Sequence, residues 1–518
     1  MALLGELVKT GMKFRKKLSM VQFSAAEIQM HQLLYLLRMA RSTEFGMKYK
    51  FDEMIYQADI SPSDVKVAYQ IYKNTVPIFN YNKIYTEWWH QSLDAKENIC
   101  WPGKVKYFAL SSGTSESASK RIPLTKDMIK SLRRTSLEQL TSMIHFEEIP
   151  PDSFTKPWLL LGGSTDLHKK GNYYEGDLSG IGAKNLPFWF QRFYKPGKKI
   201  SQIKVWDEKI DEIILHAQNW DIGFIVGVPA WIQILLEKII AHYKIAHIHE
   251  LWPNLAVYTY SGVSVEPYRK NLNKLFGKPV TFIETYLASE GFIAYQKYPD
   301  KGMQLSLNGS IFFEFVPFNS ENFDSDGEIL PTCKSYMIGE IEEGIDYAIL
   351  LSTCAGTWRY LIGDTIRFTN KETQEIIITG RTKHFLSLCG EHLSVENMSK
   401  AVEMLSKELN IIVQEFTVTG IAHGSLFAHQ WYLGTSSKEY SDQILAQKID
   451  EYLCELNDDY KVERASALKE ICVKTYPPTV FYDWMKKYGK YGAQAKFPRV
   501  LNKDLHEKWK EFTDCIEI

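Results

Sequence analysis

The sequence predicts an α/β fold with a large N-terminal domain and a smaller α+β C-terminal domain. Strand-like and helical patterns alternate from about residue 105, strand-like runs dominate residues 310–379, and a second alternation of helices and strands follows Gly380. Alternation of this kind is typical of α/β layers in which most strands pair in parallel. The change of pattern near residues 380–383 predicts a domain boundary there.

The pattern of apolar and charged residues in the first 50 positions predicts amphipathic helices. Apolar side chains recur at helical spacing over residues 3–8, and Lys9, Lys13 and Lys16 fall on the polar side. We favour a helix packed on the body of the protein, with an anchor on a membrane surface as the alternative. The apolar stretch at residues 2–4 is broken by Glu6, so a secretory leader is not expected.

The following 240 residues supply the expected α/β core. Strands are expected at 105–110, 158–161, 223–226, 255–260 and 280–284. Helices are expected between them, at 126–143, 206–219, 229–243 and 267–275.

The C-terminal half is expected to divide into two units. Turn signals at Asp326-Gly327, Glu343-Gly344 and Cys354-Ala-Gly356 punctuate the strand-rich stretch. After it, helices are expected at 395–409 and 441–457, and strands at 414–419 and 426–433. We therefore expect an N-terminal domain of residues 1–380 and a C-terminal domain of residues 381–518.

Composition and charge exclude several classes of protein. The chain of 518 residues is 45% hydrophobic and 24% charged, as in ordinary soluble proteins, and is long enough for two or more cores. A net charge of −1 gives no sign of a nucleic-acid partner. The longest apolar run, residues 222–236, is interrupted by glycine, proline and glutamine, and is shorter than the roughly 20 apolar residues that cross a bilayer. We expect neither nucleic acid nor a membrane as partner.

Cysteine usage predicts a cytoplasmic protein. The seven cysteines are widely spaced, odd in number and contain no C-x-x-C pair. This distribution favours free thiols in a reducing compartment over a disulfide framework or a zinc site.

The first chemical signal is the segment Ser111-Ser-Gly-Thr-Ser-Glu-Ser-Ala-Ser-Lys120, which follows an expected strand. A triphosphate needs many hydrogen-bond donors and a cation. Ser111, Ser112, Thr114 and Ser115 supply hydroxyls, Gly113 lets the backbone approach, and Lys120 supplies charge. The segment is not a Walker loop, and a polar surface loop is the alternative.

Two further segments carry carboxylates. Glu284-Thr-Tyr-Leu-Ala-Ser-Glu290 is expected to follow a strand directly: Glu290 could hold Mg²⁺ against phosphates, Tyr286 offers a flat face for adenine, and Ser289 adds a hydroxyl. Arg359-Tyr-Leu-Ile-Gly-Asp364 sets a carboxylate at a glycine turn, expected at a strand end, which suits a grip on a ribose diol. Ordinary strand-end structure is the alternative for each.

Two basic segments complete the set. Gly380-Arg-Thr-Lys383 lies at the expected domain boundary, and Gly492-Ala-Gln-Ala-Lys496-Phe-Pro-Arg499 lies near the C-terminus. A lysine between glycines and a proline could sit on a tip that swings into a site. A solvent-exposed lysine is the alternative.

The order of these segments resembles that of the adenylate-forming superfamily, which includes acyl-CoA synthetases. Within it, the chain most closely resembles the auxin-responsive promoter family, whose plant members are acyl acid amido synthetases. The resemblance covers nearly the whole chain and rests on Ser-Ser-Gly-Thr-Ser with Lys120-Arg-Ile-Pro123, Ile225-Val-Gly-Val-Pro-Ala-Trp231, Tyr258-Thr-Tyr-Ser-Gly262, Tyr286-Leu-Ala-Ser-Glu290, Gly363-Asp364 and Gln494-Ala-Lys-Phe-Pro-Arg499.

The resemblance implies a fold, cofactors and a set of site residues. The fold is a large domain of mixed sheets, helices and a β-barrel-like portion, with a small mobile domain; the cofactors are ATP and Mg²⁺. Lys496, Lys120 and Glu290 would be catalytic, with Glu290 as the Mg²⁺ ligand. The nucleotide would be bound by Ser111, Ser112, Gly113, Thr114, Ser115, Ser261, Gly262, Val263, Tyr286, Ser289, Asp364 and Arg381.

The resemblance also implies a hinge, a pocket and substrates. The small domain would rotate about Lys383 between two half-reactions. The acyl pocket would draw on Val226, Val228, Trp231 and Ile283, for which plain core packing is the alternative. The substrates would be a small carboxylic acid and an amino acid, with coenzyme A or a carrier-protein thiol as the alternative acceptor.

Two departures from the family pattern leave a third class of function open. The family usually has glycine where this chain has Ser117, and arginine where Leu361 stands. Arg359 would then be the nearest guanidinium to Asp364, on a strand face that the sequence does not decide. A relative that binds nucleotide or acyl ligand without catalysis is therefore the alternative to an enzyme.

Overall fold

The computed structural model describes residues 23–60, 66–111, 120–262, 264–324, 327–382, 385–386, 393–423, 426–457, 460–461, 464, 468–488 and 496–516. The helix expected at residues 3–17 lies outside this part of the chain. The elements that follow it are α2 (Ala25–Ala40), α3 (Glu44–Lys48), α4 (Phe51–Ile60) and α5 (Lys66–Thr75). Ser24 caps α2 through a reciprocal hydrogen-bond pair with Glu27, which explains where this helix begins.

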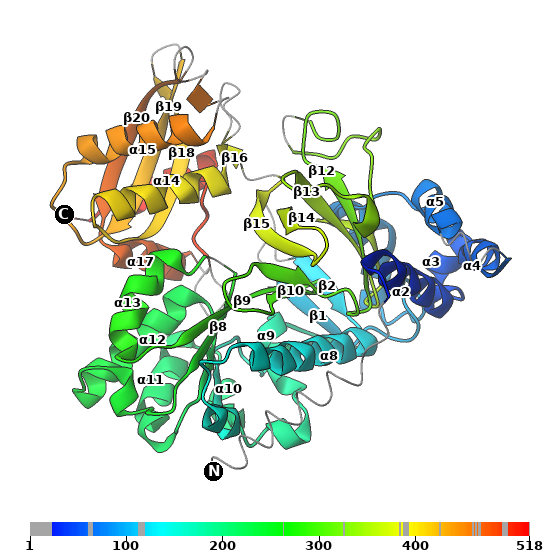
Figure 1. Cartoon of the computed structure of the whole chain (residues 1–518), viewed down its shortest axis with the longest axis horizontal. Helices are drawn as coiled ribbons and strands as arrows, with labels where there is room; N and C mark the ends of the chain where they lie inside the picture. The colour runs from blue at the N-terminus through cyan, green and yellow to red at the C-terminus, as the bar shows by residue number, and fades with distance from the viewer. Residues whose placement is uncertain are drawn as a thin grey trace.

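An eleven-stranded sheet forms the centre of the molecule (Figure 1). In spatial order its strands are β12 (Ile311–Pro317), β13 (Asp346–Thr353), β14 (Thr357–Asn370), β15 (Glu375–Arg381), β11 (Met303–Leu305), β10 (Gly291–Gln296), β9 (Thr281–Ala288), β8 (Val257–Ser261), β7 (Phe224–Val226), β3 (Trp158–Leu160) and β6 (Tyr194–Lys195). A separate four-stranded sheet has the order β2 (Lys120–Leu124), β1 (Tyr107–Ser111), β5 (Tyr173–Gly176) and β4 (His168–Lys170).

The expectation of mainly parallel pairing holds for only part of the large sheet. The strands from β9 through β8, β7 and β3 to β6 are parallel, whereas every pairing from β9 to β12 is antiparallel. The physical reason is connection length. Only two residues join β9 to β10, which is enough for a hairpin and far too short for a parallel crossover.

Helices cover both faces of the parallel part. α11 (Trp206–His216), α12 (Pro229–Tyr243) and α13 (Glu266–Phe276) share one apolar cluster with β3, β7 and β8. On the other face, the end of α8 (Lys126–Ser142) packs with Phe224, Val257 and Ile283. The remaining helices of this region are α6 (Tyr81–Ile84), α7 (His90–Leu93), α9 (Leu178–Lys184) and α10 (Lys198–Ser201).

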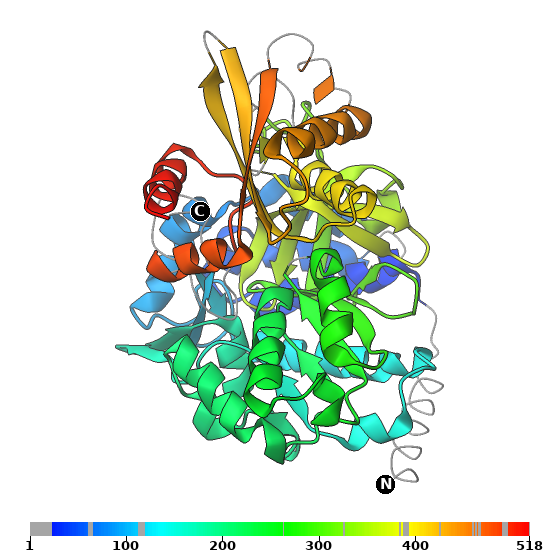
Figure 2. The same cartoon turned by 90° about the vertical axis from the view of Figure 1, so that its left-hand side faces the viewer.

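The C-terminal part contains its own sheet and two apolar clusters. The sheet has the order β18 (Val413–His423), β19 (Leu426–Thr435) and β20 (Leu468–Tyr476). One face is covered by α14 (Val395–Glu408) and α15 (Asp442–Leu456), the other by α17 (Pro478–Lys487) and α18 (Lys503–Thr513). In Figure 2 this sheet stands above the larger part of the molecule. The described residues contain no helix with the length and apolar character that a membrane crossing requires.

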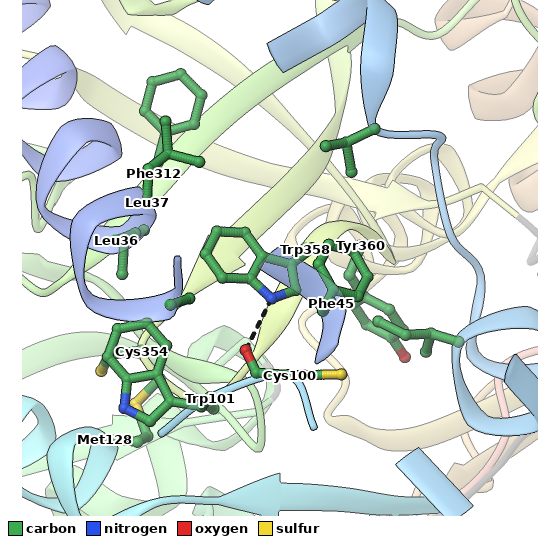
Figure 3. Packing of buried hydrophobic residues seen from close by; sticks show 14 of the residues in the cluster. Leu36, Leu37, Phe45, Cys100, Trp101, Met128, Phe312, Cys354, Trp358 and Tyr360 are labelled. Atoms are coloured by element: carbon green, nitrogen blue, oxygen red, sulfur yellow. Dashed lines mark hydrogen bonds between the residues drawn. The ribbon is translucent and has the colours of Figure 1, made fainter. Parts of the chain in front are cut away.

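The N-terminal helices are joined to the sheet by tight aromatic packing. Trp358 of β14 stacks on Phe45 of α3 at 5.6 Å, and its indole donates a hydrogen bond to the Cys100 carbonyl (Figure 3). Figure 3 shows Leu36 and Leu37 of α2 close to this group. Burial of such large side chains is the main favourable term in packing one layer on another.

A buried ion pair lies beside this aromatic packing. The Arg359 guanidinium, only 4% exposed, donates to the Glu314 carboxylate, to Ser335, and to the carbonyls of Lys73 and Val76. Every N–H of this guanidinium therefore has a partner, which compensates its removal from water. The pair ties the end of α5 to β12 and β14.

We predict that Glu314→Gln lowers the free energy of unfolding by about 3–5 kcal/mol, because it leaves a buried guanidinium without its counter-charge. Urea unfolding at pH 7 would measure the loss. Asp346→Asn is the matched control, since Asp346 pairs with Arg367 through two similar hydrogen bonds but both side chains are about one-third exposed. That variant should lose less than about 1 kcal/mol. Equal losses would contradict the role assigned to burial.

Candidate active site

The two ends of the serine- and threonine-rich segment, Ser111 and Lys120, lie in neighbouring strands. Ser111 ends β1 and Lys120 begins β2, and the two are paired across the antiparallel register. Ser112, Gly113, Thr114 and Ser115 lie outside the described residues. The Lys120 ammonium lies 5.5 Å from the centre of the Tyr81 ring, an ordinary cation–π distance, and also acts on the Glu290 carboxylate.

Asp364 is the centre of the polar cluster. One carboxylate oxygen accepts a hydrogen bond from the Tyr286 hydroxyl, and the other lies 2.7 Å from Nε of Arg381. Asp364 and Arg381 are direct neighbours across β14 and β15, while Tyr286 comes from β9. Asp364 itself is buried, whereas the Arg381 side chain keeps 45% of its surface accessible to water. The cluster is therefore open to solvent on the arginine side.

Glu290 sits next to this group in the turn between β9 and β10. The pKa of its carboxyl is raised to about 7: burial is the largest cause and Asp364 adds to it, while a backbone hydrogen bond, Lys120 and Arg381 oppose the rise. The Tyr360 hydroxyl lies near the same carboxylate: its pKa is raised mainly by burial, and the Glu290 charge raises it further. The raised pKa of Glu290 means that the protein stabilises the ionised carboxylate less well than water would, so a nearby cation would stabilise this form.

Lys496 reaches the cluster from the far end of the sequence. Gly262 has φ +91°, and a Cβ at that position would lie 2.8 Å from Cε of Lys496, so only glycine leaves room for the lysine side chain. The Lys496 side chain is exposed to solvent, but the protein packed against it lowers its pKa to about 8. Arg381 contributes to this lowering and Asp364 opposes it. Lys496, Arg381 and Asp364 thus act on one another directly.

The remaining site residues fall into three groups. Ser261 and Ser289 are half-buried, at the end of β8 and just after β9, near Gly262 and Glu290 respectively. Val263 and Lys383 lie outside the described residues. Among the residues expected in the acyl pocket, Val226 and Val228 are half-buried, and Cγ2 of Val228 lies 3.9 Å from the Cβ position at Gly262.

Trp231 and Ile283, also expected in the acyl pocket, are both fully buried. Trp231 packs against Trp206 and Tyr482, whereas Ile283 faces the apolar cluster under α8. The two side chains therefore contribute to different parts of the core.

Two local expectations were wrong. Tyr286 does not follow a strand but lies inside β9, which continues to Ala288. Asp364 does not end a strand either: it lies in the middle of β14, just after Gly363 with φ +91° and an irregularity in the pairing. Glycine followed by a polar residue disfavours a strand locally, but neighbouring strands supply the pairing that holds β14 together here.

Comparison with known protein families assigns the chain to one of them. Sequence models of the GH3 family match it in three parts: the N-terminal domain at residues 14–161 and 132–281, the central domain at 305–380, and the C-terminal domain at 396–504. The chain belongs to the GH3 family. The family expected from the motifs is confirmed.

Individual GH3 proteins are similar over shorter stretches. Jasmonoyl–L-amino acid synthetase JAR4 of Nicotiana attenuata is 29% identical over 32% of this chain and 28% of its own length. Jasmonoyl–L-amino acid synthetase GH3.5 of Oryza sativa subsp. japonica is 28% identical over 38% of this chain and 36% of its own. The match thus spans about a third of these curated relatives.

Solved structures share the fold over nearly the whole chain. The GH3.15 acyl acid amido synthetase has a TM-score of 0.75 at 15% identity and covers 97% of this chain and 96% of its own. A 2-hydroxyisobutyryl-CoA ligase in the postadenylation state has a TM-score of 0.57 at 11% identity, with 94% and 92% covered. The expected α/β fold of adenylate-forming type is confirmed.

Leu361, one departure from the GH3 pattern, now has a structural context. Its side chain packs in an apolar cluster with Val316, Ala348 and Leu350. Arg359, the guanidinium considered as a substitute, is fully engaged with Glu314 and does not reach Asp364. The guanidinium at Asp364 is that of Arg381. Ser117, the other departure, lies outside the described residues.

The motif analysis missed Tyr360. It precedes Asp364 by four residues on β14, and its contact with Glu290 links two of the motifs. The signal that could have revealed it is strand periodicity, which places residues four apart on one face.

The pKa of Lys496 offers a direct test of this arrangement. We predict that Arg381→Gln raises it above about 8, because a neighbouring positive charge is removed, and that Asp364→Asn lowers it, because a stabilising negative charge is removed. Amine acylation against pH, quantified on the Lys496 peptide by mass spectrometry, gives the midpoint. Exposed lysines, with ordinary values near 10.4, serve as the internal reference. Shifts in the same direction for both variants would contradict the geometry.

Proposed function

We propose that this GH3 chain uses ATP to convert a carboxylic acid into an acyl-adenylate and then transfers the acyl group to an amino acid amine. The observation that carries the proposal is the meeting of Lys120, Glu290, Asp364, Arg381 and Lys496, which come from segments spread over nearly four hundred residues. So many charges near one another suit a highly charged ligand.

The chemistry requires charge stabilisation more than proton transfer. A carboxylate resists nucleophiles because its leaving group would be oxide. When one carboxylate oxygen attacks the α-phosphorus of ATP, pyrophosphate leaves and that oxygen becomes part of AMP, which in turn leaves when the amine attacks the acyl carbon. Negative charge builds up at the α-phosphate during this step. Lys496, held against Gly262, is the cation proposed to stabilise it, while Lys120 and the hydroxyls of residues 111–115 bind the phosphates.

Asp364 and its neighbours are proposed to bind the nucleoside. Asp364 is already oriented by Tyr286 and Arg381, so its carboxylate can receive a ribose hydroxyl without rearranging. Tyr286, Ser261, Gly262 and Val263 would border the adenine, with Ser289 beside them. The acid would lie along Val226 and Val228, next to Lys496.

The residues around Glu290 fit Mg²⁺ in one respect. Mg²⁺ binds through one or two protein carboxylates and completes its shell with water and phosphate oxygens. Glu290 is a single buried carboxylate whose pKa is raised mainly by burial, so a cation bound beside it would favour its charged form. No cluster of three or more metal-ligating side chains occurs among the described residues, so substrate oxygens would have to supply the rest. Bound there, the ion would neutralise phosphate charge.

Domain movement would separate the two half-reactions. Residues 381–518 are proposed to turn about Lys383, carrying Lys496 out of the cluster so that the second substrate can enter. Large rotations of this kind are a common way to use one site twice.

The acceptor is tested by product analysis. Incubation of acid, ATP and either an amino acid or coenzyme A, followed by mass spectrometry, distinguishes an amide from a thioester. The names of the curated relatives favour the amide. Binding of nucleotide with no product from a panel of aromatic and fatty acids would instead favour a non-catalytic relative.

We predict that Lys496→Ala reduces acid-dependent pyrophosphate release by about 10²–10³-fold, because one preorganised charge is lost at the transferring centre. ATP affinity, measured by calorimetry, should change little, since the other phosphate-binding groups are intact. Undiminished pyrophosphate release in this variant would overturn the role proposed for Lys496.

The pH profile gives an independent prediction. Lys496 is charged below its pKa of about 8 and neutral above it, so the adenylation rate should fall as pH rises through 8. Lys496→Arg stays charged at higher pH; it should be slower at pH 7 because its planar group fits differently, but it should lose the alkaline decline. An unchanged decline would show that another group causes it.

A further inference from the structure

The segment that carries Lys496 is attached to the edge of β18. The Val418 amide donates to the Arg499 carbonyl at 3.0 Å, the Leu501 amide donates to the Val418 carbonyl at 2.9 Å, and the Thr417 hydroxyl donates to the Pro498 carbonyl at 2.7 Å. The backbone that follows Lys496 by two to five residues is therefore held to β18.

Glu415 of β18 joins this segment to the large part of the molecule. One of its oxygens accepts a hydrogen bond from Nη1 of Arg499 at 2.7 Å, and the other accepts one from the Tyr268 hydroxyl, also at 2.7 Å. Tyr268 belongs to α13, which packs on the large sheet. Both Glu415 and Tyr268 are buried, so water does not compete for this bond.

Two other polar contacts that the described residues make between the two parts are exposed. Lys486 pairs with Asp207, and Lys270 donates to Asn410 at 3.0 Å, in both cases at the surface. Exposed pairs are screened by water and contribute little to holding two elements together. A buried hydrogen bond to a charged group contributes considerably more.

We propose that the Tyr268–Glu415 hydrogen bond is a latch that holds Lys496 against Gly262 during adenylation and opens when the small part turns. Tyr268 and Glu415 are then positioning residues that act through Lys496. This inference rests on the function proposed above. The ion pair with Arg499 travels with β18, so Glu415 keeps a counter-charge after the latch opens, and opening leaves no unpaired charge.

The test separates the two half-reactions. Tyr268→Phe removes one hydroxyl and keeps the ring. It should slow acid-dependent pyrophosphate exchange roughly tenfold, as expected for loss of a hydrogen bond to a charged group, and leave aminolysis of preformed acyl-adenylate unchanged or faster. Tyr243→Phe is the matched control, because its hydroxyl donates to the Ile214 and Leu215 carbonyls within the large part. Both half-reactions of that variant should match the wild type.

A second readout does not depend on activity. Without ATP, Tyr268→Phe should make Lys496 several-fold less reactive toward an amine-specific reagent at pH 8, because the lysine spends less time against Gly262 and beside Arg381, where its pKa is lowered to about 8, and the protonated amine does not react. Glu415→Gln should do the same. Unchanged labelling in both variants, or equal slowing of both half-reactions, would overturn the latch. Wild-type protein with no pyrophosphate exchange would overturn the proposed function, while the labelling would still decide on the latch.

Discussion

The buried carboxylate of Asp364 is the interaction on which the rest of the site depends. It fixes the Tyr286 hydroxyl and the Arg381 guanidinium, and so joins three strands of the large sheet at one point. Its charge also raises the pKa of both Glu290 and Lys496, which disfavours the charged form of Glu290 and favours that of Lys496. Asp364 can contact these groups because Gly363, with its positive φ, lets β14 depart from regular pairing just before Asp364.

The two shifted pKa values have a common physical origin. Glu290 and Lys496 carry opposite charges, and both are shifted toward neutrality because protein has replaced the water around them. A ligand with phosphates and a divalent cation would return to each group the charge it lacks. The electrostatics of the site therefore suit a charged ligand, as the proposed chemistry requires.

β14 connects this chemistry to the stability of the fold. Arg359 holds the end of α5, Tyr360 lies near Glu290, and Asp364 holds Tyr286 and Arg381. One strand therefore serves packing and, in the proposed function, also carries the residues on the metal side and the sugar side of the site. Because the ion pair of Arg359 is enclosed, the strand is fixed against the helices while the solvent side of Arg381 stays open.

The sequence by itself determined the family, the α/β class and the identity of most polar residues in the site. Helix α12 was predicted with its bounds of Pro229 and Tyr243, because a proline at the first turn and an apolar run are local signals. Family motifs identified Glu290, Asp364 and Lys496 because those residue types are few and their order is distinctive.

Only the tertiary structure decided which strands continue and which side chains meet. Gly363-Asp364 has the local character of a turn, and it takes pairing with β13 and β15 to keep it in a strand. The partner of Arg359 is also decided by tertiary structure: it binds Glu314, which is 45 residues away in the sequence, and not Asp364, which is close in the sequence. Contacts of this range depend on register and sheet order, which local propensity does not encode.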